Sequence, residues 1–146
     1  MKKLFLVGLV AILASSSLLT SCSKYDEGSK FTLLTKKSRV INDWKLVSMT
    51  QNGTLLDMTG FVITSKFTKD GAYSTTSAYT FMGQTFTDVA SGTWTFNDDK
   101  TKLLTVETGT SITGEWTIIQ LAKDNMKLQQ YDATTSSTTV TVWATK

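Results

Sequence analysis

Few side chains of this 146-residue chain could take part in acid–base or nucleophilic chemistry. The chain has no histidine and one cysteine, which excludes the Ser-His-Asp and Cys-His arrangements and most catalytic zinc sites. Glu107 and Glu115 flank one predicted hairpin and could form the pair of carboxylates that glycosidases need. Charged side chains on strands usually point to water, however, and most other carboxylates fall at predicted turns. We therefore expect a protein that is not an enzyme and holds no metal or cofactor.

The single thiol, Cys22, directly follows an N-terminal segment with the layout of a secretory signal. Two lysines provide a positive start, residues 4–13 are almost wholly apolar, and small residues come next. This stretch is short for a membrane span, although a retained transmembrane anchor is the alternative. The segment LTSC at 19–22 resembles the lipobox of bacterial lipoproteins. The resemblance implies that Cys22 becomes the lipidated first residue after cleavage, and several acyl chains would hold the protein firmly on a membrane.

The chain is thus predicted to have three parts: a signal peptide at 1–21, the lipidated cysteine with a flexible polar tether at 22–39, and one domain at 40–146. Lys24, Asp26 and Glu27, close to the anchor, resemble the acidic export signal of surface lipoproteins in the Bacteroidetes. The resemblance implies a lipid-anchored protein of the outer membrane. Its domain would be exposed on the cell surface or, alternatively, would face the periplasm.

Net charge gives no reason to expect a nucleic-acid partner. The formal charge of +3 includes two lysines of the signal peptide, so 13 of the 15 basic residues remain against 12 acidic ones. No run of lysine or arginine is interleaved with aromatic residues. The predicted partners are therefore the membrane, through the lipid, and a small apolar ligand or an envelope protein.

The domain reads as an all-β structure. It contains no proline, and its commonest residue is threonine, which suits the water-facing side of a sheet. Apolar and small residues alternate in the segments 72–81, 92–97, 115–122 and 138–144, whereas a convincing helical period is missing from the mature sequence. Turn residues recur about every ten positions, at Asn52-Gly53, 69–71, Met82-Gly83, Ser91-Gly92, 97–99, Thr108-Gly109 and 123–125. This spacing predicts an antiparallel meander of about eight strands that closes into a barrel.

Four segments carry a family resemblance: INDWKLVS at 41–48, FTKDGAY at 67–73, GTWTFNDDKTKLLTV at 92–106 and WTIIQLAKDNMKLQ at 116–129. Their order is similar to that of the lipocalin-like domains found in many Bacteroidetes lipoproteins. The resemblance implies an eight-stranded barrel with Trp44 packed across its closed end. One departure is that Asn42 and Asp43 stand where the family usually has glycine, so we expect one of them to adopt the left-handed conformation of that bend.

Aromatic side chains are the remaining candidates for a site. In the predicted strands they alternate in a way that places several on the inner face of the barrel, and the candidates for ligand binding are Tyr73, Tyr79, Phe81, Trp94, Phe96 and Trp116. Plain core packing is the alternative, because aromatic residues dominate the cores of small β domains. Tyr73 and Tyr79 favour a pocket, since an inward phenol needs a partner or a wet cavity.

Two functional hypotheses follow. In the first, the protein is a lipid-anchored binding module that holds a small apolar or amphipathic ligand in the barrel mouth. In the second, the barrel is filled, and the protein is a structural or interaction component that binds an envelope partner. An open interior would favour the first hypothesis, and a packed interior with an exposed apolar patch would favour the second.

Overall fold

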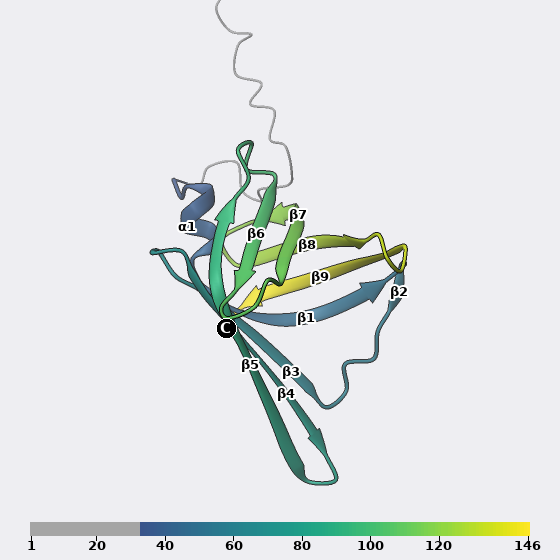
Figure 1. Cartoon of the computed structure of the whole chain (residues 1–146). Helices are drawn as coiled ribbons and strands as arrows, with labels where there is room; N and C mark the ends of the chain where they lie inside the picture. The colour runs from purple at the N-terminus through teal and green to yellow at the C-terminus, as the bar shows by residue number, and fades with distance from the viewer. Residues whose placement is uncertain (1–32) are drawn as a thin grey trace, which may run out of the picture.

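The computed structural model describes residues 33–146, and antiparallel strands make up most of that part of the chain (Figure 1). The predicted signal peptide, Cys22 and the first part of the predicted tether lie outside the described residues. A short helix, α1 (Lys36–Val40), comes first. The strands are β1 (Asp43–Gln51), β2 (Thr54–Leu55), β3 (Phe61–Phe67), β4 (Ala72–Phe81), β5 (Gln84–Phe96), β6 (Lys102–Glu107), β7 (Thr113–Leu121), β8 (Asn125–Asp132) and β9 (Ser137–Thr145).

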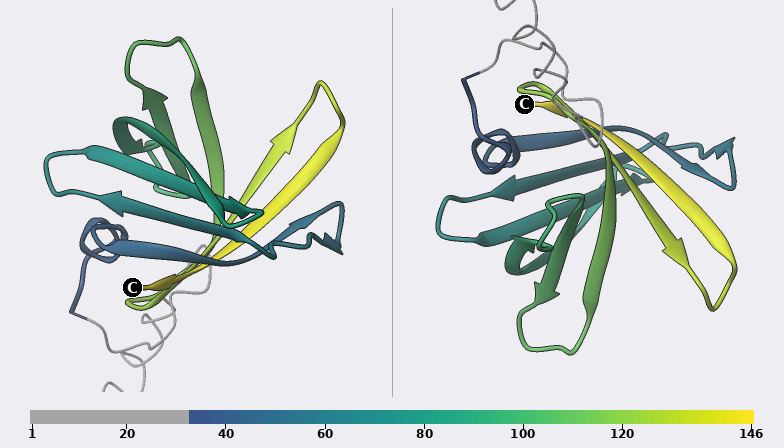
Figure 2. Two further views of the ribbon diagram at one scale, coloured as in Figure 1. Left: turned by 90° about the horizontal axis from the view of Figure 1, so that it is seen from below. Right: turned by 90° about the horizontal axis from the view of Figure 1, so that it is seen from above.

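The sheet closes on itself because its last strand pairs with its first. Strands β3 to β9 follow one another as antiparallel neighbours, β1 pairs with β3, and β9 returns to pair with β1 over most of its length (Figure 2). The two-residue strand β2 pairs only with the end of β1 and is not one of the strands that close the barrel. The prediction of a single all-β antiparallel meander barrel of about eight strands is confirmed.

Tight turns join the strands where the sequence has its turn residues. Met82 and Gly83 connect β4 to β5 with φ values of 49° and 77°, and positive φ at both central residues is the signature of a type I′ hairpin. Asn52 and Gly53 follow β1 with φ values of 50° and 81°. These pairs lie at the open end of the barrel, together with the β6–β7 and β8–β9 turns.

Ser91-Gly92 is the exception, because the turn predicted there is wrong. Both residues lie within the long strand β5, and Gly92 is buried. A Cβ atom on Gly92 would stand 2.0 Å from the carbonyl oxygen of Val106 and 2.9 Å from the Tyr73 ring. The glycine is therefore explained by the close approach of its neighbours on both sides and not by a bend.

The opposite end of the barrel is closed by α1 and by large side chains beneath it. Trp44 is fully buried, and its Nε1 donates a 2.9 Å hydrogen bond to the carbonyl oxygen of Val40, the last residue of α1. The side chain of Arg39 is also buried and donates to the carbonyl oxygen of Leu121 at 3.2 Å. Residues 36–39, which the sequence assigned to the flexible tether, thus belong to the folded domain, because Val40 and Arg39 anchor them to the barrel.

The left-handed bend expected at Asn42 or Asp43, just before Trp44, is not present. The φ values that are positive at non-glycine residues within 33–146 belong to Asn52, Met82, Lys100 and Ser136, so neither Asn42 nor Asp43 is left-handed. Instead, Asn42 Oδ1 accepts a 2.9 Å hydrogen bond from the Asp43 amide. The helix α1 turns the chain into the barrel, so no glycine-like bend is needed there.

Candidate ligand-binding cavity

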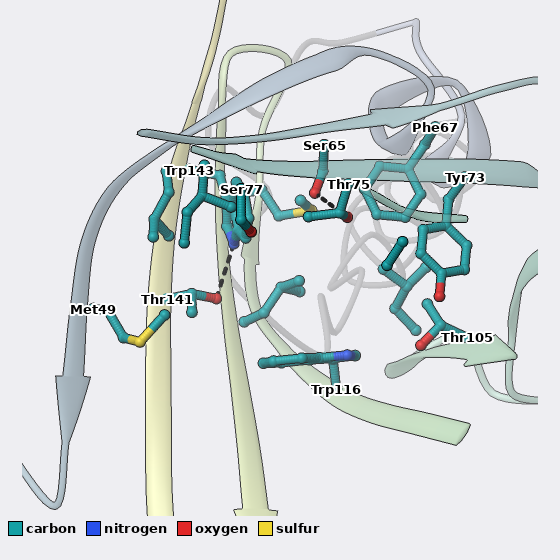
Figure 3. Close-up of a pocket in the computed structure, with 16 residues that line it drawn as sticks. Met49, Ser65, Phe67, Tyr73, Thr75, Ser77, Thr105, Trp116, Thr141 and Trp143 are labelled. Atoms are coloured by element: carbon teal, nitrogen blue, oxygen red, sulfur yellow. Dashed lines mark hydrogen bonds between the residues drawn. The ribbon is translucent and has the colours of Figure 1, made fainter. Parts of the chain in front are cut away.

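A cavity of about 330 Å³ lies inside the barrel, between the packed closed end and the open end (Figure 3). This volume is at the lower end of the range of small-molecule sites. Alternation places its lining on inward positions of the strands around the barrel. The lining residues are Leu46, Met49, Ile63, Ser65, Phe67, Tyr73, Thr75, Ser77, Ala90, Leu103, Thr105, Trp116, Met126, Leu128, Thr141 and Trp143.

None of these 16 side chains is charged, and most of the polar groups among them bond to one another. The hydroxyl groups of Ser65 and Thr75 are 2.7 Å apart in a hydrogen bond, and Trp143 Nε1 donates to Thr141 Oγ1 at 2.8 Å (Figure 3). A cavity without charges, in which several hydroxyl groups already have partners, favours an apolar occupant over a polar one.

Two polar groups remain available on one side of the cavity. Within residues 33–146, the indole N–H of Trp116 donates no hydrogen bond to the protein. The Tyr73 phenol faces the same space, close to Thr105 (Figure 3). Burial raises the pKa of the Tyr73 phenol, the nearby Glu107 carboxylate raises it further, and a hydrogen bond with Thr105 offsets part of the shift. Tyr73 is therefore neutral at physiological pH and able to donate its proton in a hydrogen bond.

The six aromatic candidates fall into three places. Tyr73 and Trp116 line the cavity. Trp94 and Phe96 lie below it at the closed end, where Trp94 is 5% exposed and packs edge-on against both Phe67 and Phe96, with ring centroids 5.8 and 5.7 Å apart. They do not line the cavity because the chain brings them to the closed end of β5, next to the β5–β6 turn.

Tyr79 and Phe81 lie beyond the cavity at the other end. They share the inward face of β4 with Tyr73, as period-two spacing requires, but β4 extends past the rim of the barrel (Figure 1). Tyr79 stacks on Phe61, with ring centroids 4.4 Å apart, and Phe81 is 51% exposed. The prediction that Tyr73, Tyr79 and Phe81 share one face of β4 is thus confirmed, but the three rings lie at different depths along the barrel.

Sequence reasoning missed the lining that β1, β8 and β9 supply. Leu46 and Met49 come from β1, Met126 and Leu128 from β8, and Trp143 from β9. A usable signal was present in β8 and β9, where Met126 and Leu128 alternate, as do Thr141 and Trp143. The β-bulge in β1 after Leu46 interrupts the alternation of inward and outward residues. Alternation along the sequence therefore does not predict that Met49 points inward.

The two glutamates weighed as an acid and base pair lie on opposite faces of the sheet. Glu107 occupies an inward position at the end of β6, whereas Glu115 pairs on the outer face with the ammonium of Lys102. They therefore form no glycosidase-like pair. Within residues 33–146, no three histidine, cysteine or acidic side chains gather as metal ligands, and no helix is both long and apolar enough to cross a membrane.

The sequence matches no protein-family model and no curated protein. Solved structures resemble the fold: japanin from Rhipicephalus appendiculatus, bound to cholesterol, gives a TM-score of 0.53 at 13% identity over 72% of this chain and 74% of japanin. The odorant-binding protein from bovine nasal mucosa gives a TM-score of 0.45 at 10% identity over 83% of this chain and 77% of that protein. The domain is thus a closed eight-stranded antiparallel barrel of the lipocalin-like class. At this identity the likeness concerns the fold alone.

Proposed function

We propose that the barrel is a binding module for a small, mainly apolar molecule held in its interior. The observation that carries the proposal is the uncharged cavity of about 330 Å³ above a packed closed end. Different parts of the barrel then provide its stability and its binding site. Buried side chains such as Trp44 and Leu121 fill one end, and the remaining interior is left open to a ligand.

The bound molecule would meet one polar side of the cavity. Trp116 Nε1 and the hydroxyl groups of Tyr73 and Ser77 are lining groups with capacity for a further hydrogen bond, and each can donate. An acceptor atom on the ligand, such as a carbonyl or hydroxyl oxygen, would therefore point toward β4 and β7. Cholesterol in japanin is consistent with an apolar ligand in a barrel of this class, although that similarity rests on the fold.

We also propose that the domain is lipid-anchored at the outer membrane through Cys22. This proposal rests on the signal-like segment and the lipobox-like residues 19–22, all of which lie outside the described residues. Replacing Cys22 with alanine should leave an unprocessed precursor. Mass spectrometry of the protein isolated from its host should find acyl groups on Cys22, and a free thiol there would contradict the anchor.

Uptake of a neutral fluorescent probe, N-phenyl-1-naphthylamine, tests the binding proposal. The wild-type domain should enhance its emission, and Ser77→Trp should reduce uptake severalfold because Ser77 lines the cavity. The matched control is Thr76→Trp, which places the same indole on the outer face of the same strand. No uptake by the wild type would favour a filled barrel that binds an envelope partner instead. Equal uptake by both variants would place the probe outside the cavity and contradict the proposal.

A further inference from the structure

The β4–β5 hairpin projects beyond the rest of the barrel (Figure 1). β5 is 13 residues long, but β6 pairs with only its last part, from Gly92 to Phe96. The first part of β5 is therefore paired on one side alone, with β4. Since side chains alternate regularly along both strands, the inward face of this hairpin continues the wall of the cavity past the rim.

Four aromatic rings line this inward face and the adjoining end of β3, and we call them the hairpin aromatic surface: Phe61 of β3 and Tyr79, Phe81 and Phe86 of the hairpin. Phe61, Tyr79 and Phe86 are cross-strand neighbours in register, and Tyr79 stacks on Phe61 at 4.4 Å and on Phe81 at 6.2 Å. Phe61, Phe81 and Phe86 remain 45%, 51% and 57% exposed. Rings that stack on each other and still show half their area to solvent offer a ready face to a ligand.

The aromatic surface is continuous with the cavity. A hollow of about 230 Å³ is lined by Phe61, Tyr79 and Phe86 together with Ser77 and Asp88. Ser77 also lines the interior cavity, so this one residue borders both spaces. A molecule longer than the interior would therefore leave it along the hairpin.

The charges on the inward face have one sign. The lysines of the strands, namely Lys45, Lys66, Lys102 and Lys127, flank inward residues and so point outward, and two of them pair there with Asp43 and Glu115. The inward positions of β1–β9 carry Asp88, Glu107 and Asp132 and, within residues 33–146, no lysine or arginine.

Among these three carboxylates Asp88 is the one placed to meet a ligand. Asp132 accepts hydrogen bonds from Thr134 and Thr135 in its own turn. Glu107 lies deeper, in register with Gly92 and beside Tyr73. Asp88 lies opposite Ser77, and within the described chain its carboxylate has no hydrogen bond or ion pair. It lies four residues nearer the hairpin tip than Gly92, which is about 13 Å along the strand.

The geometry points to a cationic amphiphile as the ligand: its apolar body fills the cavity, and its ammonium group lies between Asp88 and the hairpin aromatic surface. This inference rests on the proposed function. Aromatic faces attract ammonium groups within about 6 Å of a ring centroid, and an unpaired carboxylate on the same hollow adds to the attraction. An anionic head group at the same place would meet the Asp88 carboxylate and no cation.

Displacement of N-phenyl-1-naphthylamine by three amphiphiles with the same decyl chain tests the inference, each used below its micelle concentration. We expect decyltrimethylammonium to bind about tenfold more tightly than decanol at low salt, and decanoate to bind most weakly. Added salt should narrow the differences. Asp88→Asn should remove most of the preference for the cation over the alcohol. The control is Asp98→Asn, which makes the same charge change at the other end of β5.

The remaining outcomes separate this inference from the proposed function. If decanol and decyltrimethylammonium displace the probe equally, the interior binds ligands but the cationic class is wrong. If the wild type takes up no probe, the proposed function itself fails. If the domain dimerises in sedimentation experiments and Phe86→Ser returns it to a monomer, the aromatic surface serves a second copy of the chain, and the inference is overturned.

Discussion

Replacing Trp44 with alanine removes the largest fully buried side chain of the closed end. Such substitutions in protein cores cost about 3–5 kcal/mol, because transfer free energy is lost and a cavity remains. Here the substitution also deletes the donor to the Val40 carbonyl, a hydrogen bond of 2.9 Å in a buried setting. An unpaired buried carbonyl adds about 1 kcal/mol, so we expect a loss of about 4–6 kcal/mol.

Urea unfolding followed by far-UV circular dichroism measures that loss, and an unchanged m value would show that both states keep their compactness. Trp44→Phe should fall between the wild type and Trp44→Ala, because it keeps a ring but not the N–H donor. The control is Val47→Ala, at a 61% exposed position of the same strand, which should change the free energy of unfolding by at most about 0.5 kcal/mol. A loss below about 1 kcal/mol for Trp44→Ala would refute the view that the closed end stabilises the barrel.

Three further measurements test other parts of the domain. Gly92→Ala should lower the free energy of unfolding by about 1–3 kcal/mol, because its Cβ would stand 2.0 Å from a carbonyl oxygen of β6, and a neutral result in urea would contradict this close approach. Thr75→Val should cost about 1–3 kcal/mol by leaving the buried Ser65 hydroxyl without its partner, whereas adding Ser65→Ala should recover most of the loss in a double-mutant cycle. Burial and the Glu107 carboxylate raise the pKa of Tyr73 in the folded state above the ordinary tyrosine value of 10.0. The unfolded state therefore loses this proton first, and the stability that neutral Tyr73 contributes should be present below pH 10.0 and disappear as the pH rises through the raised folded pKa. Stability curves of the wild type and Tyr73→Phe at alkaline pH should converge accordingly, and parallel curves would show that the phenol titrates normally.

Local patterns were sufficient to predict the fold class. Alternation over 72–81 gives the bounds of β4 as the structure has them, and Met82-Gly83 marks the turn that follows. The error at Ser91-Gly92 has a simple physical source. Glycine serves both where the backbone turns and where another chain segment comes close, and sequence alone does not distinguish the two uses.

The sequence predicts which side chains of a strand point into the barrel better than it predicts how deep inside the barrel they lie. Tyr73, Tyr79 and Phe81 were correctly grouped on one side of β4, yet Tyr73 lines the cavity while Tyr79 and Phe81 pass the rim. What sets depth is the length of the neighbouring strands and their register, here the short pairing of β6 with β5. Those pairings join residues that are distant in the chain, as β9 with β1, and so leave no local signature.

The cavity lies where β3, β4 and β5 present small side chains to the interior of the barrel. These small residues are Ser65, Ser77 and Ala90, whereas the larger Phe67 and Tyr73 of the same strands lie nearer the closed end. The facing side carries Trp116 on β7 and Trp143 on β9. Bulky residues on both walls would fill the interior, and small residues on both would leave an unstable void, because each missing contact is lost stability. The small residues at this depth leave a space whose unmet contacts a ligand can supply, and the hairpin that carries Asp88 extends this side of the barrel outward. The proposed specificity thus depends on side chains of β4, β5 and β7, while the closed end around Trp44 keeps the barrel folded whether or not that space is occupied.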